Sequence, residues 1–136
     1  MKRITLFALT LVVSLPLFAN PALFSKYEAT RQALLKSSLP ETQAAAKALA
    51  AEATKAKNAK IAEQAAAVAK SPDIAKAQAA FATLSDEMIK LRATASGTRP
   101  SVYYCPMVKK SWLQPKGDVG NPYDKSMQMC GVLKEE

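Results

Sequence analysis

Residues 71–97 read SPDIAKAQAAFATLSDEMIKLRATASG and predict the clearest helix of this 136-residue chain, over residues 72–96. Ser71 is expected as its N-cap and Pro72 as its first residue, with an acidic side chain in the first turn. Gly97 is expected to end it. Apolar side chains recur at alternating spacings of three and four, which places them on one helical face: Ile74, Ala77, Phe81, Leu84, Met88, Leu91 and Ala95. An unbroken heptad stripe of this kind packs at a shallow angle against neighbouring helices.

Three further helices are expected upstream, at residues 21–36, 40–57 and 59–70. Residues 41–70 are dominated by Ala, which has a high helix propensity, and Asn58 is the only weak point among them. We favour two helices here, because a single helix of thirty residues would extend about 45 Å; one long helix is the alternative. Short connections between the helices predict an all-α fold, a three- or four-helix up-and-down bundle.

The composition changes after Gly97. Residues 98–136 contain both cysteines, the only tryptophan and half of the eight prolines, while Ala disappears. We expect an irregular Cys/Met segment packed on the bundle, with a short strand at Ser101–Tyr104 and with Trp112 and Tyr123 as anchors. About 40 residues without regular structure are unusual in a compact domain. Something must therefore tie this segment down, or it carries a function, or both.

The first 19 residues predict a cleavable signal peptide. Lys2 and Arg3 precede an apolar run over residues 4–18, and Ala19 is a small residue suited to the position before the cut. The apolar run of about 15 residues is shorter than the roughly 20 that span a bilayer. We therefore expect a periplasmic or secreted protein with no stable membrane insertion after cleavage, and one domain over residues 20–136.

The formal net charge of +8 and the absence of histidine limit the classes of function. Lysines alternate with acidic residues along the Ala-rich helices, which is typical of solvated helix faces. Nucleic-acid binding is not expected, because it favours basic residues clustered with aromatic ones. The lack of histidine excludes a Ser-His-Asp triad, a Cys-His dyad and any imidazole metal site. No acid/base pair is evident, so we do not expect an enzyme.

Sulfur-bearing residues fall in two clusters, at residues 104–107 (YCPM) and 127–131 (MQMCG). Thiolates and thioethers are soft ligands, which suit Cu(I) and related ions such as Ag(I). If the Gly- and Pro-rich loop between the clusters turns back, they can meet in one site. The candidate metal ligands are Cys105 and Cys130, followed by Met107, Met127 and Met129.

A disulfide between Cys105 and Cys130 is the competing interpretation. Two cysteines in an exported protein usually pair. The bond would close a loop of about 25 residues and stabilise the fold by about 3 kcal/mol. A bridge that opens on reduction would also be a redox-controlled pair of metal ligands, and free thiols are the third alternative. The spacing of the cysteines leaves these alternatives open.

The C-terminal motifs resemble a bacterial domain-of-unknown-function family. The matching residues are Cys105-Pro106-Met107, Ser111-Trp112-Leu113, Asn121-Pro122-Tyr123, Met127 and Cys130-Gly131, with Phe81–Ser85 and Met88 in the last helix. That family occurs as small secreted proteins and as C-terminal fusions to periplasmic adaptor subunits of heavy-metal (copper/silver) efflux pumps. Residues 103–108 are also similar to the heavy-metal-binding motif Tyr-x-Cys-Pro-Met-His, with Val108 in place of the histidine.

The resemblance implies metal handling by a site that contains only sulfur ligands. The first functional hypothesis is therefore a periplasmic protein that binds Cu(I) or Ag(I) and buffers the ion or delivers it to an efflux adaptor. The alternative is a structural or interaction module of the cell envelope, with a Cys105–Cys130 disulfide and no metal.

Overall fold

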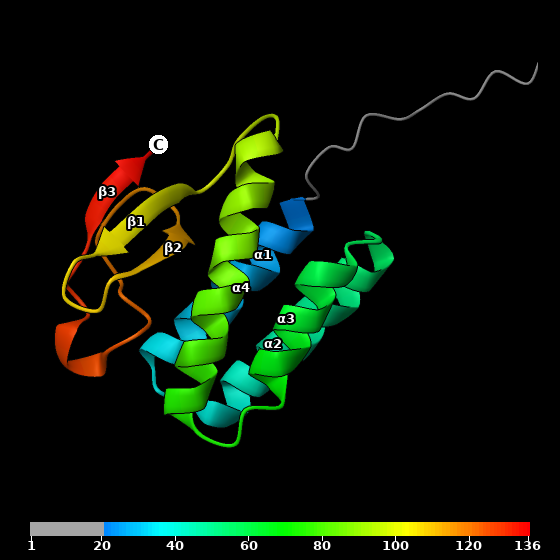
Figure 1. Cartoon of the computed structure of the whole chain (residues 1–136), viewed down its shortest axis with the longest axis horizontal. Coiled ribbons are helices and arrows are strands. Elements are labelled where there is room, and N and C mark those ends of the chain that lie inside the picture. The colour runs from blue at the N-terminus through cyan, green and yellow to red at the C-terminus, as the bar shows by residue number, and fades with distance from the viewer. Residues whose placement is uncertain (1–20) are drawn as a thin grey trace, which may run out of the picture.

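The computed structural model describes residues 21–136, so the expected signal peptide at residues 1–19 lies outside the described residues. Four helices come first: α1 (Pro21–Leu35), α2 (Leu39–Lys55), α3 (Ala59–Ala69) and α4 (Ile74–Thr94). Three strands and a short 3-10 helix follow: β1 (Ser101–Cys105), β2 (Lys110–Gln114), η1 (Lys125–Met127) and β3 (Val132–Glu135). The helices lie together, and the strands lie along the side of α4 that faces away from α2 and α3 (Figure 1). No helix within the described range is both long and apolar enough to cross a bilayer.

Short polar side chains start three of the helices. The side chains of Ser38, Asn58 and Asp73 each accept a hydrogen bond from the backbone N–H three residues further along, in α2, α3 and α4. Asn58 therefore divides the Ala-rich segment into two helices, as favoured from the sequence. The expected cap of α4 at Ser71 is wrong by two residues, because Asp73 stays extended and caps the helix itself. The Ser71 hydroxyl instead donates to the Ala67 carbonyl near the end of α3.

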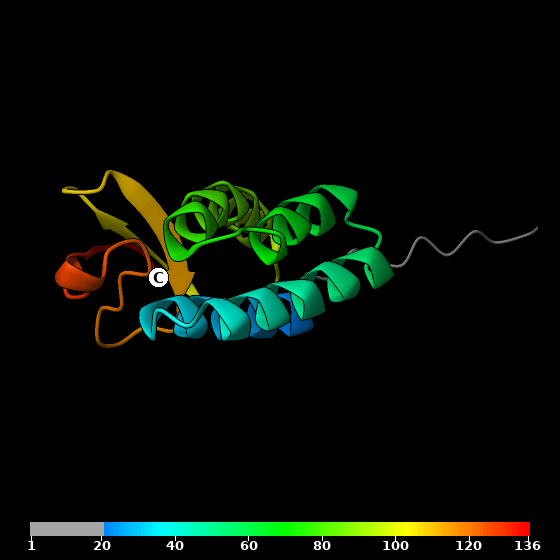
Figure 2. The same cartoon turned by 90° about the horizontal axis from the view of Figure 1, so that it is seen from below.

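The helices form two layers, with α1 and α2 in one and α3 and α4 in the other (Figure 2). The heptad stripe of α4 faces the rest of the chain, since Ala77, Phe81, Leu84 and Met88 are all fully buried. It meets apolar side chains from the other three helices in a single core. The stripe is therefore used inside this chain, against the other three helices.

The expected all-α fold is wrong, because residues 101–135 contribute a three-stranded antiparallel sheet in the order β2-β1-β3. The fold is mixed, with four helices and a sheet. β1 contains the strand expected at Ser101–Tyr104 and lies in the middle of the sheet. Tyr103 stands opposite Trp112 of β2, and a bulge interrupts the pairing with β3 between Val102 and Tyr103.

The sheet forms because a single strand cannot satisfy its backbone groups alone. β1 is rich in β-branched and aromatic residues, which favour strands, and β2 adds Trp112. The four residues between them, 106–109, turn the chain back, with Lys109 at a φ of 54°. β3 is exposed along its whole length and pairs with β1 through its backbone. Its side chains carry no alternating pattern, which explains why the sequence did not predict it.

Candidate functional site

A disulfide joins Cys105 to Cys130, with the two Cα atoms 5.3 Å apart. Cys105 is the last residue of β1 and is fully buried, whereas Cys130 lies just before β3 and is partly buried against the core. The disulfide interpretation is confirmed. Since the chain has only these two cysteines, neither is a free thiol. The bond fastens β3 and the loop before it to the central strand.

The large apolar side chains that are exposed among residues 21–136 lie close to the bridge cysteines along the chain, and two of them, at successive positions of β3, face opposite sides of the sheet. They are Met107 (71% exposed), Met129 (76%), Val132 and Leu133. Each falls within three residues of Cys105 or Cys130 along the chain. We call these four residues the bridge patch. Met88, in contrast, is fully buried in the core, as its place on the heptad stripe predicts.

The five predicted metal ligands are arranged around the bridge in different ways. The two cysteines are brought together but bonded to one another, so neither offers a thiolate in this state. Met107 and Met129 lie next to them at the surface, and Met127 is partly buried at the end of η1. Residues 21–136 contain no cluster of three or more His, Cys, Asp or Glu side chains suited to a metal ion. The soft donors of the oxidised chain are therefore thioethers.

Amide side chains order the segment between β2 and β3, which was expected to be irregular. The Gln114 Oε1 accepts hydrogen bonds from Trp112 Nε1 at 2.9 Å and from the Gly120 N–H at 3.0 Å. Asn121 donates from Nδ2 to the Met127 carbonyl at 3.2 Å. Gln114 and Asn121 are both buried. The residues that carry the bridge patch are therefore held in place by a network of hydrogen bonds as well as by the disulfide.

Two buried guanidinium groups also tie the C-terminal segment to the helices. Arg31 forms two hydrogen bonds with the Glu28 carboxylate, at 2.8 and 2.6 Å, and donates to the Gly120 carbonyl at 2.6 Å. Arg92, which is only 2% exposed, pairs with Glu135 of β3 at 2.8 Å. The sequence reasoning missed both. Each follows a buried residue of an apolar helix face by four positions, and a charged residue at such a position indicates a buried partner.

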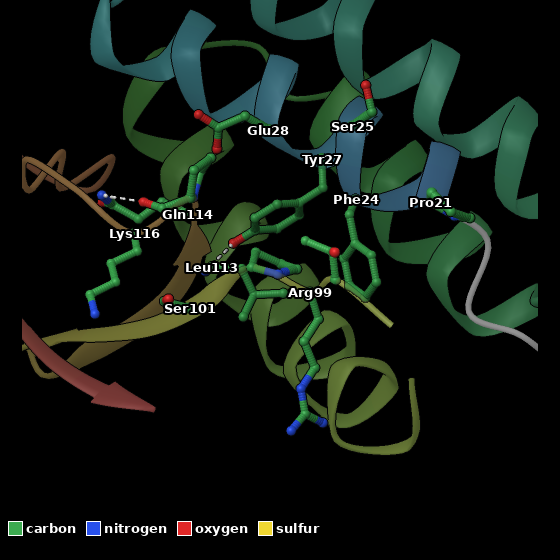
Figure 3. A pocket seen from close by; sticks show the side chains of 13 residues that line it. Pro21, Phe24, Ser25, Tyr27, Glu28, Arg99, Ser101, Leu113, Gln114 and Lys116 are labelled. Carbon is green, nitrogen blue, oxygen red and sulfur yellow. Dashed lines mark hydrogen bonds between the residues drawn. The ribbon is translucent and has the colours of Figure 1, made fainter. Parts of the chain in front are cut away.

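A cavity of about 450 Å³ opens at the end of β1 away from the bridge (Figure 3). Its lining comes from the first two turns of α1, from residues 98–101 between α4 and β1, and from residues 113–116 at the end of β2. Phe24, Leu113 and Pro100 supply apolar wall, while Arg99 and Lys116 are the cations of the lining. The sequence did not predict this cavity, because its walls come from segments far apart in the chain.

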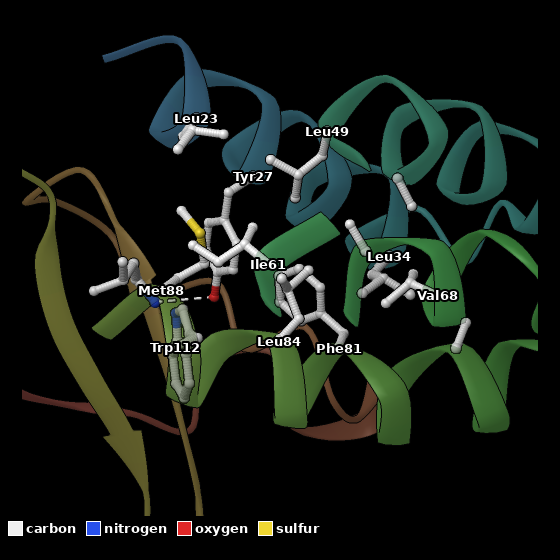
Figure 4. Close-up of a cluster of buried hydrophobic side chains, with 14 of the residues drawn as sticks. Leu23, Tyr27, Leu34, Leu49, Ile61, Val68, Phe81, Leu84, Met88 and Trp112 are labelled. Carbon is white, nitrogen blue, oxygen red and sulfur yellow. Dashed lines mark hydrogen bonds between the residues drawn. The ribbon is translucent and has the colours of Figure 1, made fainter. Parts of the chain in front are cut away.

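Tyrosine hydroxyls connect the helical core to the sheet. Tyr27 projects into the core, and its hydroxyl accepts from the backbone N–H of Leu113 at 3.2 Å (Figure 4). It also lies 2.6 Å from the Ser85 Oγ. Tyr123 donates to the Ser111 carbonyl at 2.6 Å and lies 3.0 Å from the same Ser85 Oγ. Burial raises the pKa of Tyr27 and of Tyr123, so both stay neutral and act as structural hydrogen-bonding groups.

The geometry therefore offers two surfaces, the bridge patch at one end of β1 and the cavity at the other. In comparisons with known proteins, the chain matches no family model, no curated protein and no solved structure.

Proposed function

We propose that this chain is an exported interaction module of the cell envelope, which contacts a partner protein through the bridge patch. One observation carries the proposal: the large exposed hydrophobic side chains of residues 21–136 gather within three residues of the disulfide. Exposed apolar patches mark contact surfaces, and methionine adapts its shape to a partner. A disulfide is typical of oxidising compartments, which agrees with export.

The surroundings of the bridge patch favour a partner with an acidic rim. Lys109, Lys125 and Lys134 are exposed, lie in the same segments as the patch, and form no ion pair within the described residues. Lysines around an apolar centre speed association with a surface of opposite charge. The resemblance of the C-terminal motifs makes a periplasmic adaptor subunit of a heavy-metal efflux pump the partner to test first.

Site-specific photo-crosslinking tests this proposal. A photoreactive amino acid is placed at Met107 or at Met129, and at exposed Lys47 of α2 as the control, in cells that express the adaptor. We expect the two patch positions to capture the adaptor and the control position not to. In a second measurement, Met107→Glu and Met129→Glu should weaken binding to the purified adaptor. Equal capture from Lys47, or an affinity unchanged by both substitutions, would contradict the proposal.

Binding of Cu(I) or Ag(I) is the second candidate, and the exposure of Met107 and Met129 beside the bridge favours it. Thioethers are soft ligands that release an ion readily to the next carrier when they are exposed. Reduction of the disulfide would add two thiolates from positions whose Cα atoms are 5.3 Å apart in the oxidised chain. The ion would then be buffered, or delivered to an efflux adaptor, by exchange of ligands.

A Cu(I) titration against a competing chelator tests the second candidate. The reduced chain should bind Cu(I) more tightly than the oxidised chain, and Cys105→Ser with Cys130→Ser should remove that gain. Met107→Leu with Met129→Leu should weaken binding in both states, whereas buried Met88→Leu is the matched control and should not. An affinity that neither double variant changes would remove the metal hypothesis.

A further inference from the structure

The cavity beside α1 has the size and the walls of a small-molecule site. Its volume of about 450 Å³ lies within the range of roughly 300–1,000 Å³ that is usual for ligand pockets. Phe24, Leu113, Pro100 and Pro115 give it a mostly apolar lining. It lies at the Ser101 end of β1, whereas the bridge patch surrounds the Cys105 end. The cavity is therefore independent of the proposed contact surface.

The charged groups of the lining leave one positive charge without a partner. Glu28 is neutralised by its two hydrogen bonds with the buried Arg31. Lys116 pairs with Glu136 at 2.5 Å. Arg99 has no carboxylate partner within residues 21–136, and its one hydrogen bond goes to the Arg92 carbonyl at 3.3 Å. Its side chain extends away from Glu28 (Figure 3), so a ligand anion could reach it without facing that carboxylate.

A hydroxyl group in the lining is also available. Ser101 is only 4% exposed and lines the cavity, yet its side chain forms no hydrogen bond within the described part of the chain. No buried side-chain nitrogen or oxygen among the described residues lacks a hydrogen-bond partner, so this hydroxyl is not sealed from solvent and stays open to a ligand. Ser101 can therefore donate a hydrogen bond to a molecule in the cavity, next to the apolar wall that Leu113 provides.

From the cavity, the uncompensated Arg99 and the unpartnered Ser101, we propose that this site binds a small organic anion with an apolar aromatic or acyl body. The body lies against Phe24 and Leu113. The acidic group accepts hydrogen bonds from Arg99 and from Ser101 at the rim. The inference goes beyond the proposed contact with an envelope protein and does not depend on it.

Two fluorescent probes that differ in one charge test the site. 8-Anilinonaphthalene-1-sulfonate is an aromatic anion, and N-phenyl-1-naphthylamine has the same aromatic body without the sulfonate. We expect saturable binding of the anionic probe to the purified chain and a shift of the Leu113 methyl resonances in NMR spectra. Arg99→Gln should lower the affinity for the anionic probe by about three- to fivefold, the size expected for one exposed ion pair. The affinity for the neutral probe should not change.

Two more variants complete the test. Lys76→Gln, which removes an exposed cation near the opposite end of α4, is the matched control and should bind both probes as the wild type does. Phe24→Ala should weaken the binding of both probes. Because that change could loosen the core, Arg99→Gln, which alters an exposed side chain, decides the test if Phe24→Ala does not fold. Absence of saturable binding, equal weakening in Lys76→Gln, or an Arg99→Gln affinity equal to the wild type would overturn the proposal.

Discussion

Replacing both bridge cysteines with alanine should lower the free energy of unfolding by about 3.5 kcal/mol, the loop-closure value for a separation of 25 residues. The loss is large beside the roughly 5–15 kcal/mol that stabilises a typical domain. It should be uneven across the molecule. β3 is exposed along its length, and the bridge and Arg92 hold it to the rest of the fold. The helices share a core of their own, which the bridge touches only at one edge.

Urea unfolding and hydrogen exchange measure the two parts of this prediction. The free energy from urea unfolding should fall by the stated amount for Cys105→Ala with Cys130→Ala. The amides of β3 should lose protection before those of α4. Met107→Ala with Met129→Ala is the matched control, since both are exposed and should change stability by less than about 0.5 kcal/mol. A cysteine variant within about 1 kcal/mol of the wild type, or equal loss of protection in β3 and α4, would refute the reasoning.

Three further variants test contacts that hold the sheet and its connections in place. Tyr27→Phe leaves the buried Leu113 N–H without its acceptor and should cost about 1–3 kcal/mol in urea unfolding. Because burial raises the pKa of Tyr27, stability should be complete below the ordinary tyrosine pKa of about 10 and fall as the pH rises above it, less steeply in Tyr27→Phe. Arg92→Leu should release β3, seen as faster hydrogen exchange there, whereas exposed Lys90→Leu on the same helix should not. Gly131→Ala should lower the melting temperature, because its Cβ would lie 2.7 Å from the Trp112 ring.

The helices could be predicted because their information is local. The stripe of α4 repeats within the helix itself, and Asn58 marks the turn between α2 and α3 at a single position. The sheet depends on pairing between segments that are up to 33 residues apart, as in Val102 with Glu135. Val132–Glu135 has no alternating apolar pattern that would predict a strand, and all four of its side chains are exposed in the fold. The disulfide two residues earlier fastens this segment beside β1, and the sequence left that bond open.

The candidate site was predictable in its residues and not in its geometry. The sequence identified all five sulfur-bearing residues around the bridge, because soft donors are rare and stand out by type. Whether Cys105 and Cys130 bond to each other depends on the distance that the fold sets between β1 and the residue before β3. The role of Arg99 and Ser101 also depends on the fold, because they become candidate binding residues only where α1 forms a wall of the cavity that they line.

The oxidation state of the bridge separates the two proposed functions, because they need opposite states. The disulfide helps to hold Met129, Val132 and Leu133 beside β1, in addition to the strand pairing and Arg92, and a preorganised surface binds with a smaller entropic cost. Capture of a soft ion gains two thiolates when the same bond opens. Adaptor binding and Cu(I) affinity can be measured on one sample before and after reduction. An interaction module should lose its partner on reduction. If partner binding survives reduction while Cu(I) affinity rises, metal binding by the sulfur atoms is the main function and contact with a partner through the apolar patch is secondary.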